Sequence, residues 1–388
     1  MSDDLSQELK DLIINVIAYS NISVPAQKDV RFERLGLNRG FISSIYKIIL
    51  DDNRTFVSKI TDDKQSEMMN SLHNRELEFY QWLSGCTDAA ADPDSKLLKF
   101  YGGKRCGLEP GILILNDLSP RIGVQPNYVS GYAPDLVFQI VKGIVSYQSV
   151  YLSSGKELSD GYHIRSVNER GSRDALFDRK LAWMSADHKR LIKEWSTPDS
   201  LYSIYTEIPE SVVGVSKVLV HVDLWPGNML FERTGDDTHL LAFLDWQTFQ
   251  IGNPLLDIAS VIGLCMTTEG RRAHTEGILQ LYVDAMERRR GGFKKPFEIT
   301  IDKARTLLSS ALRWPCVSIT YAIERSNDDV EKEGEEMSPL SIRLKELMKD
   351  VLNNVAPVHF SSDWRRGRSA VDILPRRRLL PCSPLRTS

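Results

Sequence analysis

The sequence predicts an α+β fold with two lobes, in which a small lobe built on an antiparallel sheet precedes a larger, mainly helical lobe. The first 115 residues alternate between helical and strand-like hydrophobic spacing, whereas helical spacing dominates from Asp135 onward. The composition, with 42% apolar and 26% charged residues over 388 positions, is typical of a globular protein with one or two cores.

The small lobe is expected to run as helix, hairpin, helix and strands. Turn-forming residues at Asp51–Arg54 separate two strand-like runs, which predicts the hairpin. Met68 and four residues after it form the apolar stripe of the second helix. In chain order, the expected elements are a helix over residues 5–16, strands Phe41–Leu50 and Thr55–Ile60, a helix over Glu67–Leu83, and strands Leu97–Tyr101 and Gly111–Leu115.

The large lobe is expected to be helical with three inserted strands. Its predicted helices are Asp135–Leu152, Arg173–Glu194, Leu255–Cys265, His274–Arg289, Asp302–Leu312 and Leu340–Val355, and its predicted strands are Lys217–Val220, Met229–Glu232 and His239–Asp245. We therefore divide the chain into a small lobe at residues 1–115, a linker at 116–124, a large lobe at 125–360 and a tail at 361–388. The tail holds seven Arg, two Asp and three Pro without core periodicity, which predicts disorder.

Composition excludes several classes of protein. Lys and Arg number 49 against 52 Asp and Glu, so no basic excess points to a nucleic acid partner. The apolar runs are far shorter than the roughly 18 residues that cross a bilayer, and the N-terminus is acidic, so we expect neither a membrane span nor a signal peptide. Five widely spaced cysteines without a Cys-x-x-Cys pair argue against disulfides and structural zinc. We expect a cytoplasmic protein, and no obligate protein partner is evident.

The most informative stretch places a His-x-Asp motif after an apolar strand and a carboxylate after another. His221 and Asp223 follow the first strand, Asn228 comes soon after them, and Asp245 ends the second. Phosphoryl transfer needs a carboxylate to accept the proton of the attacking hydroxyl and oxygen ligands for magnesium. Asp223 suits the first role, and Asn228 and Asp245 suit the second. His221 is expected to fix the loop by hydrogen bonding. The alternative is ordinary turn and strand-end chemistry.

Upstream residues complete this pattern. Lys59 lies in the second strand of the hairpin, and Glu76 lies on the following helix. A strand lysine paired to a helix glutamate is how kinases hold a cation against the α- and β-phosphates of ATP. Either residue alone would be an ordinary surface charge. Their order before Asp223, Asn228 and Asp245 is the kinase order, which favours the functional interpretation.

Two further segments are candidates for nucleotide contacts. Gly40 and Ser43 lie at the entry to the first hairpin strand, where a phosphate-covering loop would lie, although the segment matches neither the kinase glycine-rich motif nor Walker A. A plain strand entry explains these residues about as well. Asn116 and Leu118 follow the strand Gly111–Leu115, where backbone groups of a linker between lobes would meet adenine.

These residues resemble the CHK kinase-like group, which includes the ecdysteroid kinase-like proteins of insects and many nematode proteins, within the choline kinase and aminoglycoside phosphotransferase superfamily. The resemblance implies a bilobal protein-kinase-like fold and ATP-dependent phosphorylation of a small-molecule hydroxyl. It also implies that Asp257 supports the catalytic loop. The matching segments are His73–Tyr80, His221–Asn228, Leu244–Gln247 and Gly252–Asp257.

We therefore predict a kinase that uses ATP and Mg²⁺ to phosphorylate a steroid, choline-like or xenobiotic alcohol. One departure from the family pattern is Val222, where the family usually has glycine, because a β-branched residue tolerates positive φ poorly. We expect the loop to reach its conformation with negative φ at Val222. A catalytically weak, nucleotide-binding pseudokinase scaffold is the alternative. A protein kinase is disfavoured, because no Ala-Pro-Glu follows Asp245.

Overall fold

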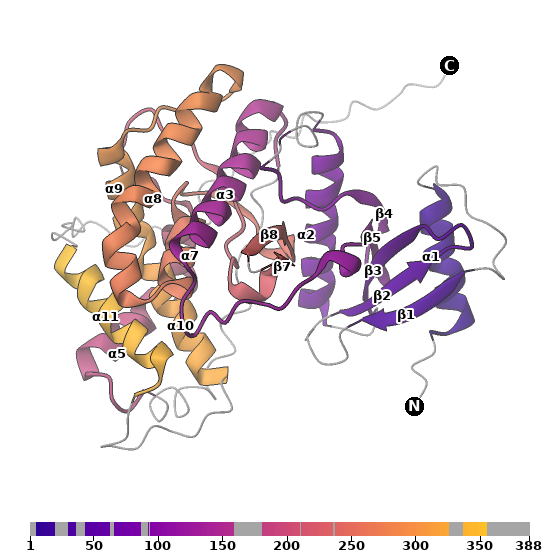
Figure 1. Cartoon of the computed structure of the whole chain (residues 1–388), viewed down its shortest axis with the longest axis horizontal. Helices are drawn as coiled ribbons and strands as arrows, with labels where there is room; N and C mark the ends of the chain where they lie inside the picture. Colours follow the sequence, from indigo (N-terminus) through magenta and orange to yellow (C-terminus); the bar gives the residue numbers. More distant parts are fainter. Residues whose placement is uncertain are drawn as a thin grey trace, which may run out of the picture.

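The computed structural model describes residues 5–19, 30–35, 43–62, 66–86, 92, 94–158, 181–209, 211–235, 237–325 and 337–354. A five-stranded antiparallel sheet lies at one end of the molecule and a larger, mainly helical part lies at the other (Figure 1). We call these parts the sheet lobe and the helical lobe. The predicted α+β fold class is confirmed. The exact lobe boundaries remain predictions, and the tail lies outside the described residues.

The sheet lobe is held together by antiparallel pairing throughout. Its strands lie in the order β1-β2-β3-β5-β4. The predicted hairpin is present, because β2 and β3 pair from Ser44 opposite Ile60 to Ile49 opposite Thr55. Asn53 in its turn has φ 63°, a conformation that asparagine tolerates. The strands are β1 (Arg31–Leu35), β2 (Ser44–Ile49), β3 (Thr55–Thr61), β4 (Phe100–Lys104) and β5 (Gly111–Asn116).

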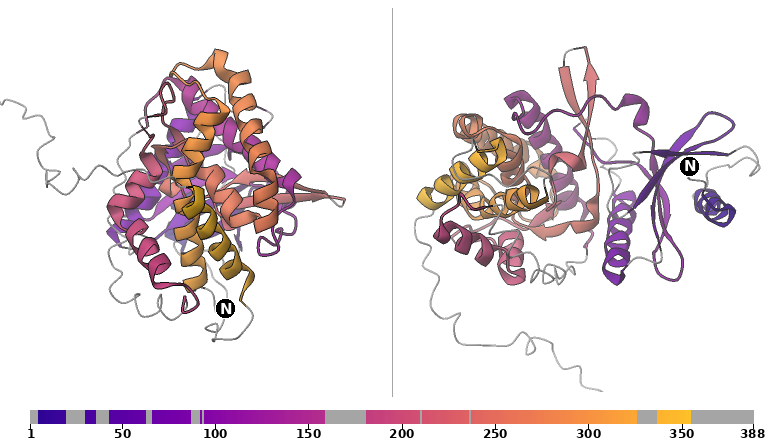
Figure 2. Two further views of the ribbon diagram at one scale, coloured as in Figure 1. Left: turned by 90° about the vertical axis from the view of Figure 1, so that its left-hand side faces the viewer. Right: turned by 90° about the horizontal axis from the view of Figure 1, so that it is seen from below.

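Both faces of the sheet are covered by helices, and the alternation of strand residues explains why. Ile112 and Ile114 belong to the apolar cluster that includes α1 (Gln7–Tyr19), whereas Leu113 and Leu115 belong to the cluster that includes α2 (Glu67–Ser84). A strand that is buried on both faces needs a continuous apolar run, which β5 has. The sheet therefore lies between α1 on its outer face and α2 on the face toward the helical lobe (Figures 1 and 2).

The helical lobe buries most of the protein's core. Its largest apolar cluster also includes residues of α2, so α2 packs on both lobes. None of the helices in the described ranges is long and apolar enough to cross a membrane. The helices are α3 (Pro134–Ser154), α5 (Ala186–Trp195), α6 (Pro198–Thr206), α7 (Leu256–Cys265), α8 (Thr268–Arg289), α9 (Ile301–Ala311), α10 (Arg313–Arg325) and α11 (Pro339–Asn354).

The sequence predictions differ from the structure in several places, and they also miss β1 and a short strand at Gln250–Gly252. The helix predicted over Arg173–Glu194 begins only at Ala186, where Ser185 caps it, and residues 181–185 are not helical. Met68 is 37% exposed and lies outside the core. Two helices were not predicted. α6 begins with a Thr197 cap and a proline in its first turn, and α10 carries Pro315 in its first turn, where a missing N–H is harmless.

Two short antiparallel pairs in the helical lobe carry the candidate site. β6 (Val218–Val220) pairs with β9 (Gln250–Gly252), and β7 (Met229–Thr234) pairs with β8 (Asp237–Phe243). Met229 lies opposite Phe243 in the second pair. The segment that follows β6 therefore ends beside the start of the segment that follows β8. Figure 1 shows β7 and β8 on the side of the helical lobe that faces α2.

Candidate active site

Lys59 lies between two carboxylates that come from different parts of the chain. Its Nζ donates to Glu76 Oε2 at 2.6 Å, and it also donates to Asp245 Oδ1. Lys59 projects from β3, Glu76 lies on α2, and Asp245 follows β8. The side chains of Lys59, Glu76 and Asp245 are 14%, 1% and 28% exposed. The predicted lysine–glutamate pair is therefore formed, and Asp245 joins it.

The residues just before Glu76 explain how α2 is held in place. His73 bonds through Nδ1 to Thr61 Oγ1 (3.1 Å) and through Nε2 to the Lys104 carbonyl (2.9 Å), so it links the helix to both β3 and β4. The amide of Asn74 makes two bonds with the backbone of Cys106, at 2.9 and 2.8 Å. Consecutive side chains on one turn of α2 thus fix its position on the sheet.

Arg75, the next residue, connects α2 to the helical lobe. Its guanidinium donates to the Phe249 carbonyl at 3.1 Å and lies 3.9 Å from the centre of the Phe249 ring. One turn later, Phe79 stacks on Trp246 with a ring separation of 4.2 Å and an interplanar angle of 7°. Both partners lie just after Asp245, so the helix that carries Glu76 is attached directly to the segment that carries Asp245.

Asp223 and Asn228 form a second group on the loop after β6. Asn228 Nδ2 donates to the backbone carbonyl of Asp223 at 2.8 Å and to its carboxylate Oδ2 at 3.1 Å. The Asn228 carbonyl accepts a bond from Leu244 N (2.9 Å), and Leu244 precedes Asp245. These contacts place the loop of Asp223 against the end of β8. Every part of the predicted constellation from Lys59 to Asp245 is therefore connected by a direct contact or by one neighbouring residue.

Asp257 supports the loop of Asp223 by hydrogen bonds to its backbone, as the resemblance implied. Its carboxylate accepts from His221 N at 2.7 Å and from Val222 N at 3.0 Å, and it also accepts from the Tyr147 hydroxyl at 2.5 Å. Asp257 lies in the first turn of α7 and is completely buried. Gly252 in β9 is required for this packing, because a Cβ there would lie 2.0 Å from the Tyr205 carbonyl.

His221 is a buried, hydrogen-bonding residue and is not in contact with solvent. Its Nε2 lies 2.7 Å from the Leu244 carbonyl, which assigns the ring proton to Nε2 because a carbonyl only accepts. Complete burial lowers the pKa of His221, so the ring is neutral near pH 7. This arrangement fits the expectation that His221 fixes the loop, and it keeps the imidazole away from any substrate.

The conformation of Val222 contradicts the sequence prediction. Its φ is 73°, not negative. Its side chain is buried, its N–H is held by Asp257, and its carbonyl accepts from Trp314 Nε1 of α10 at 2.8 Å. The prediction relied on the intrinsic preference of valine and on the protein kinases, which have arginine at the equivalent position, and it was wrong because these tertiary contacts override that preference.

The electrostatics of the Lys59 cluster favour a charged lysine. Burial alone lowers its pKa, but the carboxylates of Asp245 and Glu76 outweigh burial and raise the pKa of Lys59 above its usual range. Burial raises the pKa of Glu76, and the ammonium of Lys59 opposes that rise. One cation thus faces two carboxylates, which leaves the cluster with an excess of negative charge when all three groups are ionised.

Asn228 and Asp245 fit a magnesium ion. Both hydrogen bonds of the Asn228 amide use Nδ2, so its oxygen Oδ1 is the atom suited to a cation. Asp245 is partly exposed, and Gln247 Nε2 donates to its Oδ2 at 3.0 Å. No three His, Cys, Asp or Glu side chains in the described parts of the chain form a complete metal cage. Magnesium commonly completes such a partial site with phosphate oxygens and water.

The other predicted nucleotide contacts are only partly informative. Ser43 bonds through Oγ to Thr61 Oγ1 at 2.9 Å, and Gly40 lies outside the described residues. The Asn116 N–H already donates to the Lys99 carbonyl at 2.9 Å. For Leu118, the structure gives no hydrogen bond from the backbone N–H to another described residue. Leu118 is therefore the better of the two linker candidates for a base contact.

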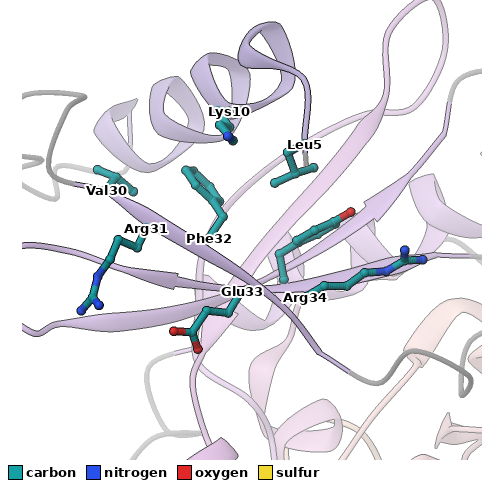
Figure 3. Close-up of a pocket in the computed structure, with 8 residues that line it drawn as sticks. Leu5, Lys10, Val30, Arg31, Phe32, Glu33 and Arg34 are labelled. Carbon is teal, nitrogen blue, oxygen red and sulfur yellow. The ribbon is translucent and has the colours of Figure 1, made fainter. Parts of the chain in front are cut away.

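One pocket of about 340 Å³ lies elsewhere, between α1 and the strands β1 and β2. In Figure 3, Phe32 points toward α1, whereas Arg31 and Glu33 point away from the helix. Tyr46, which also lines it, belongs to the apolar cluster on the α1 side of the sheet. Lys59 alternates along β3 with Phe56 and Ile60 of that cluster, so the pocket lies on the opposite face from Lys59.

Comparison with known proteins places the chain in a family. The model of the family DUF1679, described as "Uncharacterized oxidoreductase dhs-27", matches residues 42–360, which is most of the chain. The chain belongs to the DUF1679 family. This description refers to an oxidoreductase, whereas the site residues above were predicted to carry out phosphoryl transfer.

More distant likenesses accompany this DUF1679 match. The uncharacterized kinase-like protein D1044.1 of Caenorhabditis elegans is 23% identical over 57% of this chain, which spans 58% of that relative's length. A putative aminoglycoside phosphotransferase from Ralstonia eutropha matches 89% of this chain and 98% of its own, at 14% identity and a TM-score of 0.49. A macrolide 2′-phosphotransferase type I matches 89% and 99%, at 13% identity and 0.42.

Two residues of the site in this DUF1679 protein were not found from its sequence. Tyr147 lies in α3, whose sequence indicates only a buried helix, and its spacing does not distinguish it from its apolar neighbours. Trp314 lies in α10, which the sequence reasoning did not predict, far along the chain from the loop that it contacts. A residue that acts through one long-range hydrogen bond leaves no local signal in the sequence.

Proposed function

We propose that this DUF1679 protein is a kinase that uses ATP and Mg²⁺ to phosphorylate a hydroxyl group of a small molecule. The observation that carries the proposal is Lys59, held between Glu76 and Asp245 beside the linked pair Asp223 and Asn228. These contacts join residues from four separate elements. Ordinary turn residues and surface charges have no reason to meet in this way.

Each residue has a defined task in this proposal. Lys59, fixed by Glu76, binds the α- and β-phosphates of the nucleotide, and Leu118 in the linker contacts its base. Asn228 and Asp245 would hold magnesium, which when bound would neutralise the charge that develops on the phosphates. Asp223 orients the acceptor hydroxyl and takes its proton. Asn228 helps here as well, because its bond to Oδ2 fixes the direction of the Asp223 carboxylate.

The finer parts of the proposal come from the resemblance to the CHK kinase-like group. We propose membership of that group, a cytoplasmic location, and an acceptor among steroid, choline-like or xenobiotic alcohols. The oxidoreductase in the family's description would use a redox cofactor, which many such enzymes bind on parallel strands joined by a helix. The sheets in the described residues pair only in the antiparallel sense. They therefore contain no such binding unit.

Val222 favours one second candidate, the nucleotide-binding pseudokinase scaffold. A β-branched residue at φ 73° is strained, and a chain released from catalysis could carry that strain without consequence. Against this candidate, the carboxylate, amide and lysine groups are all present and mutually oriented. A protein kinase remains disfavoured, because α7 begins at Leu256, which leaves little chain after Asp245 for an activation segment.

The test is the release of ADP from Mg-ATP, with water and with a panel of small alcohols as acceptors. We expect measurable ADP release that at least one alcohol stimulates, and we expect Asp223→Asn to abolish it while ATP still raises the melting temperature. Asp187→Asn is the matched control, because Asp187 is an exposed carboxylate of α5. ATP binding without turnover in the wild type would support the scaffold, and no ATP binding would refute both functions.

A further inference from the structure

The peptide before Asp223 is strained, and the strain is local. Three residues other than glycine have positive φ in the described parts of the chain: Asn53, Val222 and Asp245. Asn and Asp tolerate this region better than other residues, whereas the branched Cβ of valine clashes with the neighbouring peptide groups. Of these three residues, Val222 therefore has the most strained backbone conformation, and it lies directly before the predicted proton acceptor, Asp223.

The strained residue is held from both sides of its Cα. On the N-terminal side, Val222 N–H donates to Asp257 Oδ1 at 3.0 Å. On the C-terminal side, its carbonyl accepts from Trp314 Nε1 at 2.8 Å. The angles φ and ψ of Val222 together relate these two sides. Two anchors on separate helices, α7 and α10, restrain both rotations, because a change of φ alone to a negative value would move the N–H away from Asp257 or the carbonyl away from Trp314.

Trp314 is itself well fixed, so it is suited to this task. It is 8% exposed, and its ring meets the Tyr205 ring edge-on, with centres 4.9 Å apart and an interplanar angle of 89°. The Tyr205 carbonyl accepts from Asn253 N at 2.8 Å, in the segment that leads to Asp257. Both anchors of Val222 therefore belong to one packed unit of the helical lobe.

From this geometry we infer that Trp314 is a positioning residue, whose indole N–H holds the strained Val222 peptide and thereby sets the direction of Asp223. The carbonyl that Trp314 binds belongs to the same peptide plane as the N–H of Asp223, so rotation of that plane turns the Asp223 side chain. The inference rests on the proposed kinase function for its catalytic consequence. The coupling between Trp314 and Val222 does not depend on that function.

The test compares Trp314→Phe in two backgrounds. Phenylalanine keeps an aromatic ring beside Tyr205 but removes the N–H. In the wild-type background, we expect the rate of ADP release from saturating Mg-ATP, with water as acceptor, to fall roughly 10- to 100-fold, which corresponds to about 1.4–2.8 kcal/mol. The KM for ATP should not change, because Lys59 and Leu118 are untouched. In the Val222→Gly background, the same substitution should cost less than about threefold, since glycine adopts positive φ without an anchor.

A melting-temperature cycle on the same four proteins makes the result independent of turnover. Trp314→Phe should lower the melting temperature more in the valine background than in the glycine background. Trp195→Phe is the matched control, because Trp195 is also 8% exposed in the helical lobe, and its effect should be the same in both backgrounds. If Trp314→Phe folds only together with Val222→Gly, the inference is supported.

Two outcomes would overturn the inference. Equal effects of Trp314→Phe in both backgrounds would show that Trp314 acts on packing and not on Val222. Failure of Trp314→Phe to fold in both backgrounds would lead to the same conclusion. If the melting cycle shows coupling while no protein releases ADP, the anchor stands and the proposed kinase function fails.

Discussion

Replacing Lys59 by methionine separates the structural role of the lysine cluster from its chemical role. Lys59 is the cation between Glu76 and Asp245, and Glu76 is 1% exposed. Methionine keeps the length of the side chain but leaves two carboxylates facing each other. Removal of one partner from a buried ion pair costs about 3–5 kcal/mol, because the remaining charge has no compensation. For a chain of this size, that loss lowers the melting temperature by roughly 4–6 °C.

The substitution Asp245→Asn should behave in the opposite way in the same cluster. It leaves Lys59 and Glu76 as a balanced pair at 2.6 Å and removes the excess negative charge. We expect the melting temperature to stay within about 2 °C of the wild type. Both variants should abolish phosphoryl transfer, because one loses the phosphate-binding cation and the other loses a magnesium ligand. Combining Lys59→Met with Glu76→Gln should recover part of the lost stability.

The destabilisation by Lys59→Met should also depend on pH, and its sign follows from the pKa shift. Burial already raises the pKa of Glu76, and the loss of Lys59 raises it further. A carboxyl whose pKa is higher in the folded than in the unfolded state costs nothing below its unfolded value of 4.5 and destabilises as the pH rises. The melting difference from the wild type should therefore be larger at pH 8 than at pH 5. A difference that is absent, independent of pH or equal to that of Asp245→Asn would refute this reasoning.

Three further predictions test other parts of the structure. Burial lowers the pKa of His73 to about 4, so the folded state favours neutral His73. The contribution of His73 to stability should therefore decline as the pH falls from about 6.5 toward 4. His73→Gln should weaken this decline in melting curves, and an unchanged pH profile would contradict the prediction. Asp257→Asn should lower stability by about 1.5–3 kcal/mol in urea unfolding, because one backbone N–H group loses its acceptor and the bond to the other loses its charge. The variant should also release ADP more slowly, and a fully active variant would remove Asp257 from the catalytic support. A chain that ends at Pro357 should melt and turn over like the full chain, because the Arg-rich segment 361–388 has no core periodicity. A lower melting temperature would show that this segment packs on one of the two lobes.

The parts of the fold that were predicted correctly are those with strong local signals. The hairpin β2–β3 has a turn-rich tetrapeptide between two strand-like runs, and β5 has a continuous apolar run that marks a strand buried on both faces. Ordering along the chain was enough to pair Lys59 with Glu76. Of the two helices that were not predicted, α6 begins at Pro198 and α10 has Pro315 in its first turn, and the signal that would have revealed α6 is Thr197 as a cap before its proline.

The parts of the site that could not be predicted depend on long-range contacts. The positive φ of Val222 is the clearest example, because intrinsic preference alone predicts the opposite sign. Only the positions of Asp257 and Trp314, on helices far along the chain, explain why the strained conformation is adopted. The contact of Lys59 with Asp245 also has no local signature, since their separation in sequence is 186 residues.

The attachment of α2 to the segment after Asp245 has a consequence for regulation. In protein kinases, activity is controlled by moving the helix that carries the glutamate toward or away from its lysine. Here the stacked rings of Phe79 and Trp246, together with the contact of Arg75 with Phe249, join that helix to the segment that follows Asp245. Outward movement of α2 would have to separate a buried aromatic stack. We therefore expect the lysine–glutamate pair to stay assembled, and we expect the rate of the proposed kinase to follow the supply of its substrates.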